Sequence, residues 1–303
     1  YEEALRIDPA FHDATVQLAV LRALQERGGE AEQLLEPVVS DQGASPRSRI
    51  DAAFELSYLL MARGRFRAAA EILSSLQPAI EGEVVREALA LSVRGLCALE
   101  GNDTATARRL IDLAIRRSPT AVTTRYLFAR GLLELRTSAW REVSRTAREI
   151  RKMALPAEDP DRTEDKAASY LEGLSLLAQG EAHRAIQLMK DSVDRNGYEY
   201  RVYRLGLAKA YLAAGQFERA LQSAKETLAS RQLIEPRLDL ELERVRALLV
   251  LAEIEAARGR RDEAAARARE FLRAWQGADR GLSDLSRAQE IAGGGTPRQP
   301  AGW

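Results

Sequence analysis

The stretch YLAAGQFERAL, residues 211–221, places a glycine between two apolar segments. Apolar residues recur at helical spacing before Gly215 and again after it, which predicts two amphipathic helices. Glycine is expected to end the first helix, because it enters left-handed backbone conformations without steric cost. The small side chain of Ala220 lets the second helix approach the first closely, and Phe217 is expected to cover the hinge end. The stretch therefore predicts an antiparallel helix pair joined by a short turn.

The same block recurs along the chain. Clear copies lie at residues 60–73 (LMARGRFRAAAEIL), 176–189 (LLAQGEAHRAIQLM) and 254–268 (IEAARGRRDEAAARA), and weaker copies lie at 24–35, 99–111 and 135–147. Ser138 stands where glycine is usual. The small residue after the turn is Ala31, Ala69, Ala107, Ala185, Ala220 or Ala264, with Val143 in the remaining copy. Successive copies are therefore 38, 38, 36, 42, 35 and 44 residues apart.

A helix pair repeated about every 34 residues resembles the tetratricopeptide repeat family. The family's small residue in the first helix is matched by Ala19, Ser57, Gly95, Gly131, Gly173, Ala208 and Ala252, and its prolines by Pro9 and Pro119. The resemblance covers about residues 1 to 275. It implies an all-α fold, a right-handed α-solenoid of antiparallel helix pairs. In such arrays stability is close to a sum of nearest-neighbour terms, so damage is expected to stay local.

The predicted array has one interruption and a distinct carboxy-terminal end. The acidic, proline-bearing stretch MALPAEDPDRTEDK predicts a loop between two groups of repeats. Residues 1–9 are interpreted as the last turns of a truncated helix, because proline cannot continue a helix. The predicted parts are amino-terminal repeats at 1–153, a linker at 154–166, carboxy-terminal repeats at 167–275, a capping helix at 276–292 and a disordered tail at 293–303.

Composition narrows the classes of partner and compartment. Lys plus Arg and Asp plus Glu both total 45, so the formal net charge is zero and a nucleic-acid partner is not expected. The lone Cys97 excludes an intramolecular disulfide and a multi-cysteine metal site. No apolar run approaches the roughly 18 residues of a membrane span. We therefore expect a cytoplasmic protein whose partner is another protein or a peptide.

Residue types that carry chemistry are few and scattered. His12 and His183 have no neighbour at a spacing typical of a catalytic relay, so both are interpreted as surface residues. Cys97 lies on the apolar side of its helix, where cysteine acts as a small hydrophobe. Solvated charge is the favoured interpretation of the acidic cluster Glu158, Asp159, Asp161, Glu164 and Asp165, which lacks the pattern of a calcium loop. The glycine run 293–295 is interpreted as linker. The sequence thus predicts no catalytic residue, no metal site and no cofactor.

The resemblance also implies a binding surface. In tetratricopeptide arrays the first helices line a concave groove, and the sites that face it here are Val16, Val20, Phe54, Tyr58, Ser92, Leu96, Phe128, Leu132, Tyr170, Leu174, Leu205, Lys209, Leu249 and Glu253. The candidate partner-binding residues among them are Val16, Phe54, Tyr58, Phe128, Leu132, Tyr170, Leu174, Lys209 and Glu253. Most are apolar or aromatic, so we expect a groove that reads apolar side chains of an extended or helical segment. Packing of the same residues helix against helix is the alternative interpretation.

The ending FLRAWQGADRGLSDLSRAQEIA, residues 271–292, looks like the closing segment of tetratricopeptide regions attached to bacterial serine/threonine kinases. The residues that match in order are Phe271, Leu272, Trp275, Ala278, Asp279, Leu282 and Leu285. The sequence contains none of the kinase motifs. The expected function is a non-enzymatic interaction scaffold, the carboxy-terminal sensory or docking arm of a larger bacterial signalling protein. A self-associating scaffold that forms homo-oligomers is the alternative.

Overall fold

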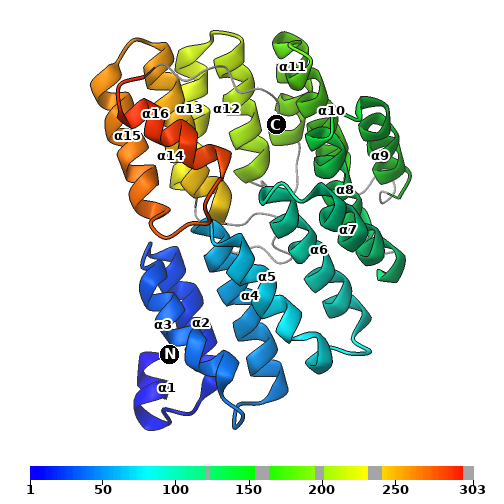
Figure 1. The fold of residues 1–303 in the computed structure, drawn as a ribbon, viewed down its shortest axis with the longest axis vertical. Helices are drawn as coiled ribbons and strands as arrows, with labels where there is room; N and C mark the ends of the chain where they lie inside the picture. Colours follow the sequence, from blue (N-terminus) through cyan, green and yellow to red (C-terminus); the bar gives the residue numbers. More distant parts are fainter. Residues whose placement is uncertain (120–122, 154–163, 195–200, 231–240, 296–303) are drawn as a thin grey trace.

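The computed structural model describes residues 1–119, 123–153, 164–194, 201–230 and 241–295. These residues form sixteen α-helices and contain no strand (Figure 1). After α1 (Glu2–Ile7), fourteen helices form seven pairs: α2 (His12–Leu24) with α3 (Gly28–Ser40), α4 (Pro46–Ala62) with α5 (Phe66–Ser75), α6 (Val84–Glu100) with α7 (Thr104–Arg117), α8 (Thr123–Arg136) with α9 (Trp140–Met153), α10 (Glu164–Ala178) with α11 (Ala182–Asp194), α12 (Arg201–Ala213) with α13 (Phe217–Ala229), and α14 (Glu241–Ala257) with α15 (Arg261–Ala274). A single 3-10 turn (Gln77–Ala79) follows α5, and α16 (Ser283–Ala292) ends the described chain.

Each pair turns at a residue in the left-handed backbone region, five positions before the small residue of the second helix. The seven residues, with φ between 54° and 82°, are Glu26, Gly64, Asn102, Ser138, Gly180, Gly215 and Gly259. In every turn the next residue donates its backbone N–H to a carbonyl five residues back, at 2.8 to 2.9 Å. This is the hydrogen bond that closes a helix end of the Schellman type. The predicted turns are confirmed, although three of them use a residue other than glycine.

The small residues allow close contact between helices. Ala31, Ala69, Ala107, Ala185, Ala220, Ala264 and the substituting Val143 are all buried. A Cβ added to Gly95 would lie 2.7 Å from Cγ1 of Ile111, and one added to Gly173 would lie 2.8 Å from Cγ of Met189. Both neighbours belong to the second helix of the same pair. Gly131 differs, because its added Cβ would meet Leu171 of the next pair at 2.5 Å.

The pairs stack in chain order and the stack turns back on itself (Figure 1). The last pair, α14 and α15, lies beside the second pair, with α14 packed against α4. One hydrophobic cluster consequently contains buried residues from α2 to α6 together with α14 to α16, and a second runs from α8 to α14. The solenoid is therefore closed rather than open-ended.

The predicted parts of the chain lie as follows. The linker prediction 154–166 falls mostly on residues outside those described, and its last three residues belong to α10. The predicted division into two groups of repeats stays a prediction. Within the predicted cap, α16 packs on α15 and α14. Residues 296–303 of the predicted tail are also outside the described ranges.

Candidate functional site

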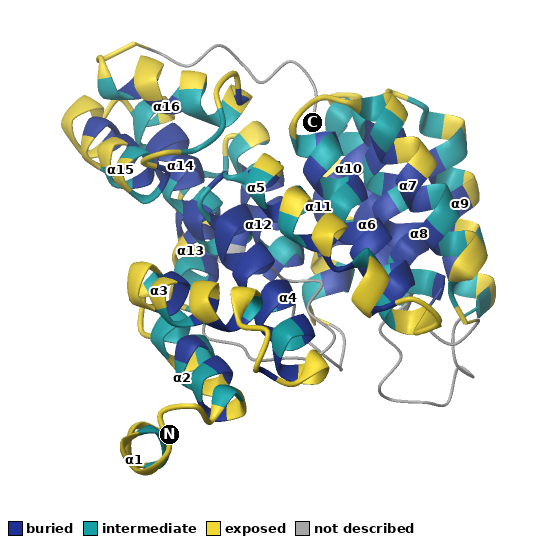
Figure 2. Ribbon diagram, turned by 60° about the horizontal axis from the view of Figure 1, so that its bottom comes forward, coloured by how far each residue is buried: buried dark blue, intermediate teal, exposed yellow. Residues whose placement is uncertain are grey.

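The nine predicted binding residues lie on the first helices of six pairs, and most are buried in the closed molecule. Val16, Phe54, Tyr58, Phe128, Tyr170, Leu174 and Glu253 are buried, and Leu132 and Lys209 are half-buried. Figure 2 shows the same distribution, with dark blue concentrated on helices such as α4, α8 and α12. Partner binding by these residues stays a prediction. The aromatic residues among them form two separate groups.

The first group is a cluster of three aromatic rings, Phe128, Tyr170 and Tyr203, from three consecutive first helices, in which each ring contacts the other two. The ring centroids of Phe128 and Tyr170 are 6.1 Å apart, and those of Tyr170 and Tyr203 are 5.0 Å apart. Tyr170 fits against Gly206, where an added Cβ would lie 2.4 Å from the ring. The predicted anchors Phe128 and Tyr170 thus pack helix against helix. Tyr203, which completes the cluster, lies about one helix turn before Gly206, the glycine that receives the Tyr170 ring.

The second group lies where α4 meets α14. Phe54 and Tyr58 of α4 are 6.4 Å apart between ring centroids, and they share a hydrophobic cluster with Val245 and Leu249 of α14. This contact is not one between neighbours in the stack, because α4 belongs to the second pair and α14 to the seventh. First-helix faces of two distant pairs therefore cover each other.

The connection between α15 and α16, residues 275–282, completes the closure on the turn between α4 and α5. The indole Nε1 of Trp275 donates to the carbonyl of Ala62 at 3.0 Å, and the ring packs edge-on against Phe66. The backbone N–H of Asp279 donates to the carbonyl of Gly64 at 3.0 Å. The Asp279 carboxylate in turn accepts from the backbone N–H of Arg67 at 2.9 Å. We call residues 275–282 the closing segment.

A network of ion pairs accompanies the closing segment. Arg246 of α14 donates two hydrogen bonds to the carboxylate of Glu100, at 2.9 and 2.5 Å, and one to Asp284 at 2.8 Å. The paired carboxylates hold the pKa of Arg246 well above its usual value, against the effect of burial. Arg287 of α16 pairs with Glu253 and with Asp284. The network links α6, α14 and α16, and two-point Arg–carboxylate contacts of this kind fix relative orientation.

Lys209 lies next to this network and carries a strongly perturbed ammonium group. Its pKa is lowered to about 7 by burial and by the positive charges of Arg287 and Arg246, which Asp284 and Glu100 offset only in part. The side chain keeps some accessible surface yet is surrounded by protein. The protonated, charged form of a lysine in such surroundings lowers the stability of the folded state.

Comparison with known families decides the identity of the repeats. The sequence model of the family described as tetratricopeptide repeat matches residues 54–122, 170–233 and 205–279, which together exceed half of the chain. The chain belongs to the tetratricopeptide repeat family. The repeats indicate a scaffold for protein–protein interaction.

Solved structures of tetratricopeptide proteins share the fold. A tetratricopeptide repeat protein from Parabacteroides merdae superposes with a TM-score of 0.51 at 13% identity, over 93% of this chain and 98% of that one. A chain of the APC/C hetero-tetramer Cut9-Hcn1 superposes with a TM-score of 0.59 at 16% identity, over 91% of this chain and 50% of its own length. At such identities the likeness shows the fold alone. A search of curated proteins found no match.

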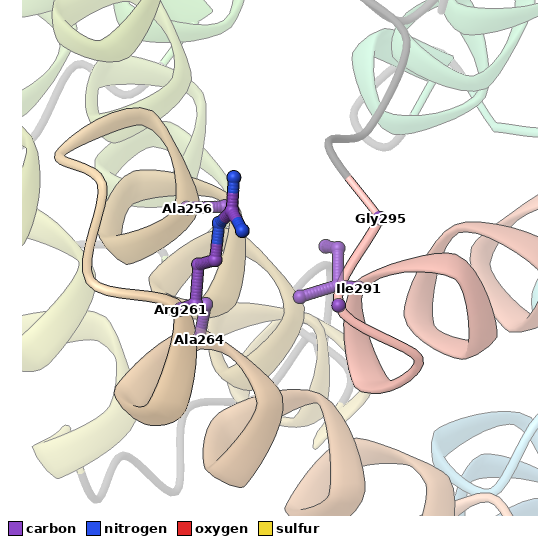
Figure 3. Close-up of a pocket in the computed structure, with 6 residues that line it drawn as sticks. Ala256, Arg261, Ala264, Ile291 and Gly295 are labelled. Atoms are coloured by element: carbon purple, nitrogen blue, oxygen red, sulfur yellow. The ribbon is translucent and has the colours of Figure 1, made fainter.

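Two hollows in the tetratricopeptide array are small or lie apart from the predicted binding residues. One, of about 20 Å³, lies between α14, α15 and the end of α16 and is lined by residues that include Arg261 and Ile291 (Figure 3). It has room for about one water molecule. The other, of about 360 Å³, lies beside Gln77, Glu87 and Arg117. Neither borders any of the nine predicted binding residues.

The two histidines and the cysteine do not form a catalytic group in the array. His12 is half-buried, and its Nε2 lies 2.9 Å from Oδ2 of Asp41, a partner that the sequence spacing did not indicate. His183 is exposed, as predicted. Cys97 is 3% exposed, and burial raises the pKa of its thiol far above the usual range. A buried thiol of this kind is not a nucleophile.

Within the ranges that the structure describes, no group of three or more His, Cys, Asp or Glu side chains is arranged to hold a metal ion. The predicted acidic cluster falls mostly outside them. None of the described helices combines the length and apolar character that crossing a membrane requires.

Proposed function

We propose that this tetratricopeptide array is a non-catalytic scaffold that binds an extended or helical segment of a protein partner along its first-helix faces. The observation that carries the proposal is the contact of α4 with α14. Phe54 and Tyr58 of α4 and Leu249 of α14 are buried apolar residues of one hydrophobic cluster. A protein segment with apolar anchors has the chemistry to take the place of either face.

The test uses peptides selected on the protein itself. A phage-displayed library of random peptides is selected against the full chain, and affinities of synthetic copies are measured for the wild type and for Phe54→Ala with Tyr58→Ala. Because aromatic anchors dominate such interfaces, the double variant is expected to lose about tenfold or more in affinity. Far-UV circular dichroism checks that the variant remains helical.

A matched control separates loss of this surface from general loss of apolar side chains. Val84 and Val85 are large apolar residues that are exposed at the start of α6, and neither belongs to the hydrophobic cluster that α4 and α14 share. The variant Val84→Ser with Val85→Ser is expected to bind the selected peptides like the wild type. Equal binding by all three proteins would rule out the proposed surface.

Self-association is a second candidate function, and one observation favours it. Tyr1, Ile7, Phe11 and Leu21 are exposed large apolar residues at the amino-terminal end of the array, with Ile7 76% exposed. Figure 2 shows α1 exposed along most of its length. Exposed apolar side chains that gather at one end favour contact with another protein surface. A molecular mass that stays monomeric by light scattering from high to low micromolar concentration would exclude this function.

We also propose that the array serves as the docking arm of a bacterial signalling protein such as a serine/threonine kinase. The support is the resemblance of residues 271–292 to the carboxy-terminal end of tetratricopeptide arrays that are attached to bacterial kinases. Phosphorylation assays with the intact gene product test this role. Deletion of the array should abolish phosphorylation of a docked substrate while autophosphorylation continues, and an unchanged substrate rate would refute it.

A further inference from the structure

The closing segment makes contacts that differ in kind from those between stacked pairs. Arg65, the N-cap residue of α5, makes no side-chain hydrogen bond to the first turn of the helix. The carboxylate of Asp279 takes that role and accepts a hydrogen bond from the backbone N–H of Arg67. A carboxylate at a helix amino terminus both satisfies a free N–H and complements the helix dipole. The end of α4 is likewise bound from outside, since Trp275 and Asp279 donate to the carbonyls of Ala62 and Gly64.

The other closing contacts also fall on the turns of early pairs. Arg244 of α14 lies 3.3 Å from Glu26, the left-handed residue of the first turn. Arg246 binds Glu100, which ends α6 just before the third turn. The last pair therefore sits across the turns of the first three pairs. The last pair is thus held by polar contacts at these turns and by the hydrophobic cluster that it shares with α2 to α6.

From this arrangement we infer that the closing segment is an intramolecular latch: its release separates α14 from α4 and uncovers the apolar first-helix faces of both. The inference rests on the proposed function in one respect, namely that those faces are the ones a partner binds. A partner that binds only the open array pays for opening, so its apparent dissociation constant is the intrinsic value divided by the open fraction. The latch thereby sets the affinity of the array.

Glycine geometry provides a test with a close internal control. An added Cβ at Gly64 would lie 2.8 Å from Cβ of Ala278 and 3.0 Å from the Trp275 ring. Gly64→Ala therefore displaces the closing segment from the turn between α4 and α5. Gly215 occupies the same position in the sixth pair, has the same φ of 71°, and has nothing within 4 Å of an added Cβ. Gly64→Ala and Gly215→Ala carry the same backbone strain, and only the first disturbs the latch.

Opening is measured as the distance between α5 and α15. Spin labels are placed at exposed Glu71 on α5 and exposed Arg269 on α15, on a Cys97→Ala background, and the distance distribution is recorded in frozen solution. The wild type and Gly215→Ala are expected to give one short distance, and Gly64→Ala a second, longer population. Hydrogen exchange of the Asp279 amide should be about tenfold faster in Gly64→Ala than in Gly215→Ala. Identical distances and exchange in the two variants would overturn the latch.

A second variant keeps the test valid if Gly64→Ala fails to fold. Asp279→Ala removes the acceptor of the Arg67 N–H without adding bulk, and Asp262→Ala at an exposed site in the first turn of α15 is its control. The longer population is expected in Asp279→Ala and not in Asp262→Ala. Equal distributions in this pair count against the latch in the same way.

The selected peptides then distinguish the latch from the proposed function. Opening with at least tenfold tighter peptide binding supports both. Opening without tighter binding leaves the latch standing and refutes the α4–α14 faces as the binding surface. Tighter binding at an unchanged distance overturns the latch alone.

Discussion

Ala220 has no accessible surface, and its counterparts in the other pairs occupy the same place between two helices. Because the helices are already in contact there, extra methylene groups force them apart. Ala220→Leu is expected to lower the free energy of unfolding by about 1 to 3 kcal/mol. Exposed Ala213→Leu in the same pair should change it by less than about 0.5 kcal/mol. Urea unfolding compares the two, and a neutral Ala220→Leu would contradict the packing account.

Lys209 is a residue at which protonation opposes folding. Its folded-state pKa is about 7, below the ordinary 10.5, so the folded protein binds fewer protons than the unfolded one between these values. The free energy of unfolding must therefore rise with pH from about 7 to about 10, and the full penalty applies below that window.

Lys209→Met is expected to remove this rise and to stabilise the protein near pH 6 by about 1 to 2 kcal/mol, after allowance for the partial exposure of the side chain. Urea unfolding at pH 6 and pH 9.5 measures the effect. Lys225→Met, at an exposed site of α13, should keep the wild-type pH profile. If the wild type and Lys209→Met show the same slope with pH, the ammonium group is not penalised as argued.

Among the elements, the turns between paired helices differ in how well their central residue suits the left-handed region. Ser138 is exposed, has φ of 54° and is a residue that enters this region at a cost of roughly 1 kcal/mol. Ser138→Gly is expected to raise the free energy of unfolding by about 0.5 to 1 kcal/mol, and thermal unfolding measures it. Asn102→Gly should give no gain, because asparagine tolerates the region and its Oδ1 accepts from Arg136 at 3.1 Å. Equal gains in both variants would show that backbone strain is not the cause.

Helix pairs and turns were predictable from sequence because both depend on residues within about a dozen positions of each other. Gly215 and Ala220 specify a turn and a close approach through their own sterics, and Ser138 could be aligned to the turn by its distance from Val143. The aromatic cluster was only half predictable. Phe128 and Tyr170 were identified by repeat position, but their role depends on Tyr203 and Gly206, which another pair contributes.

At the scale of the whole molecule, closure was not predictable from the repeat pattern. Gly64 and Gly215 lie in nearly the same local sequence, yet one turn receives the closing segment and the other receives nothing within 4 Å. The difference arises from small rotations between successive pairs that add up along the stack. The signal that did exist was the run Trp275, Ala278 and Asp279, which follows the last pair and resembles the ends of family members. In the structure, Trp275 and Asp279 bind at the turn between α4 and α5.

Closure also changes how damage spreads, because it adds a contact between pairs that are not neighbours in the chain. Leu73 of α5 is buried in the cluster that also contains Phe271 and Trp275. Leu73→Ala is expected to cost about 2 to 5 kcal/mol and to speed hydrogen exchange in α15, about 200 residues away in the chain. Met189→Ala, equally buried in the fifth pair, should speed exchange in α10 to α12 and leave α15 protected. An open solenoid with nearest-neighbour terms alone would instead leave α15 protected in both variants, and that result would show that the closing contacts do not couple the two ends.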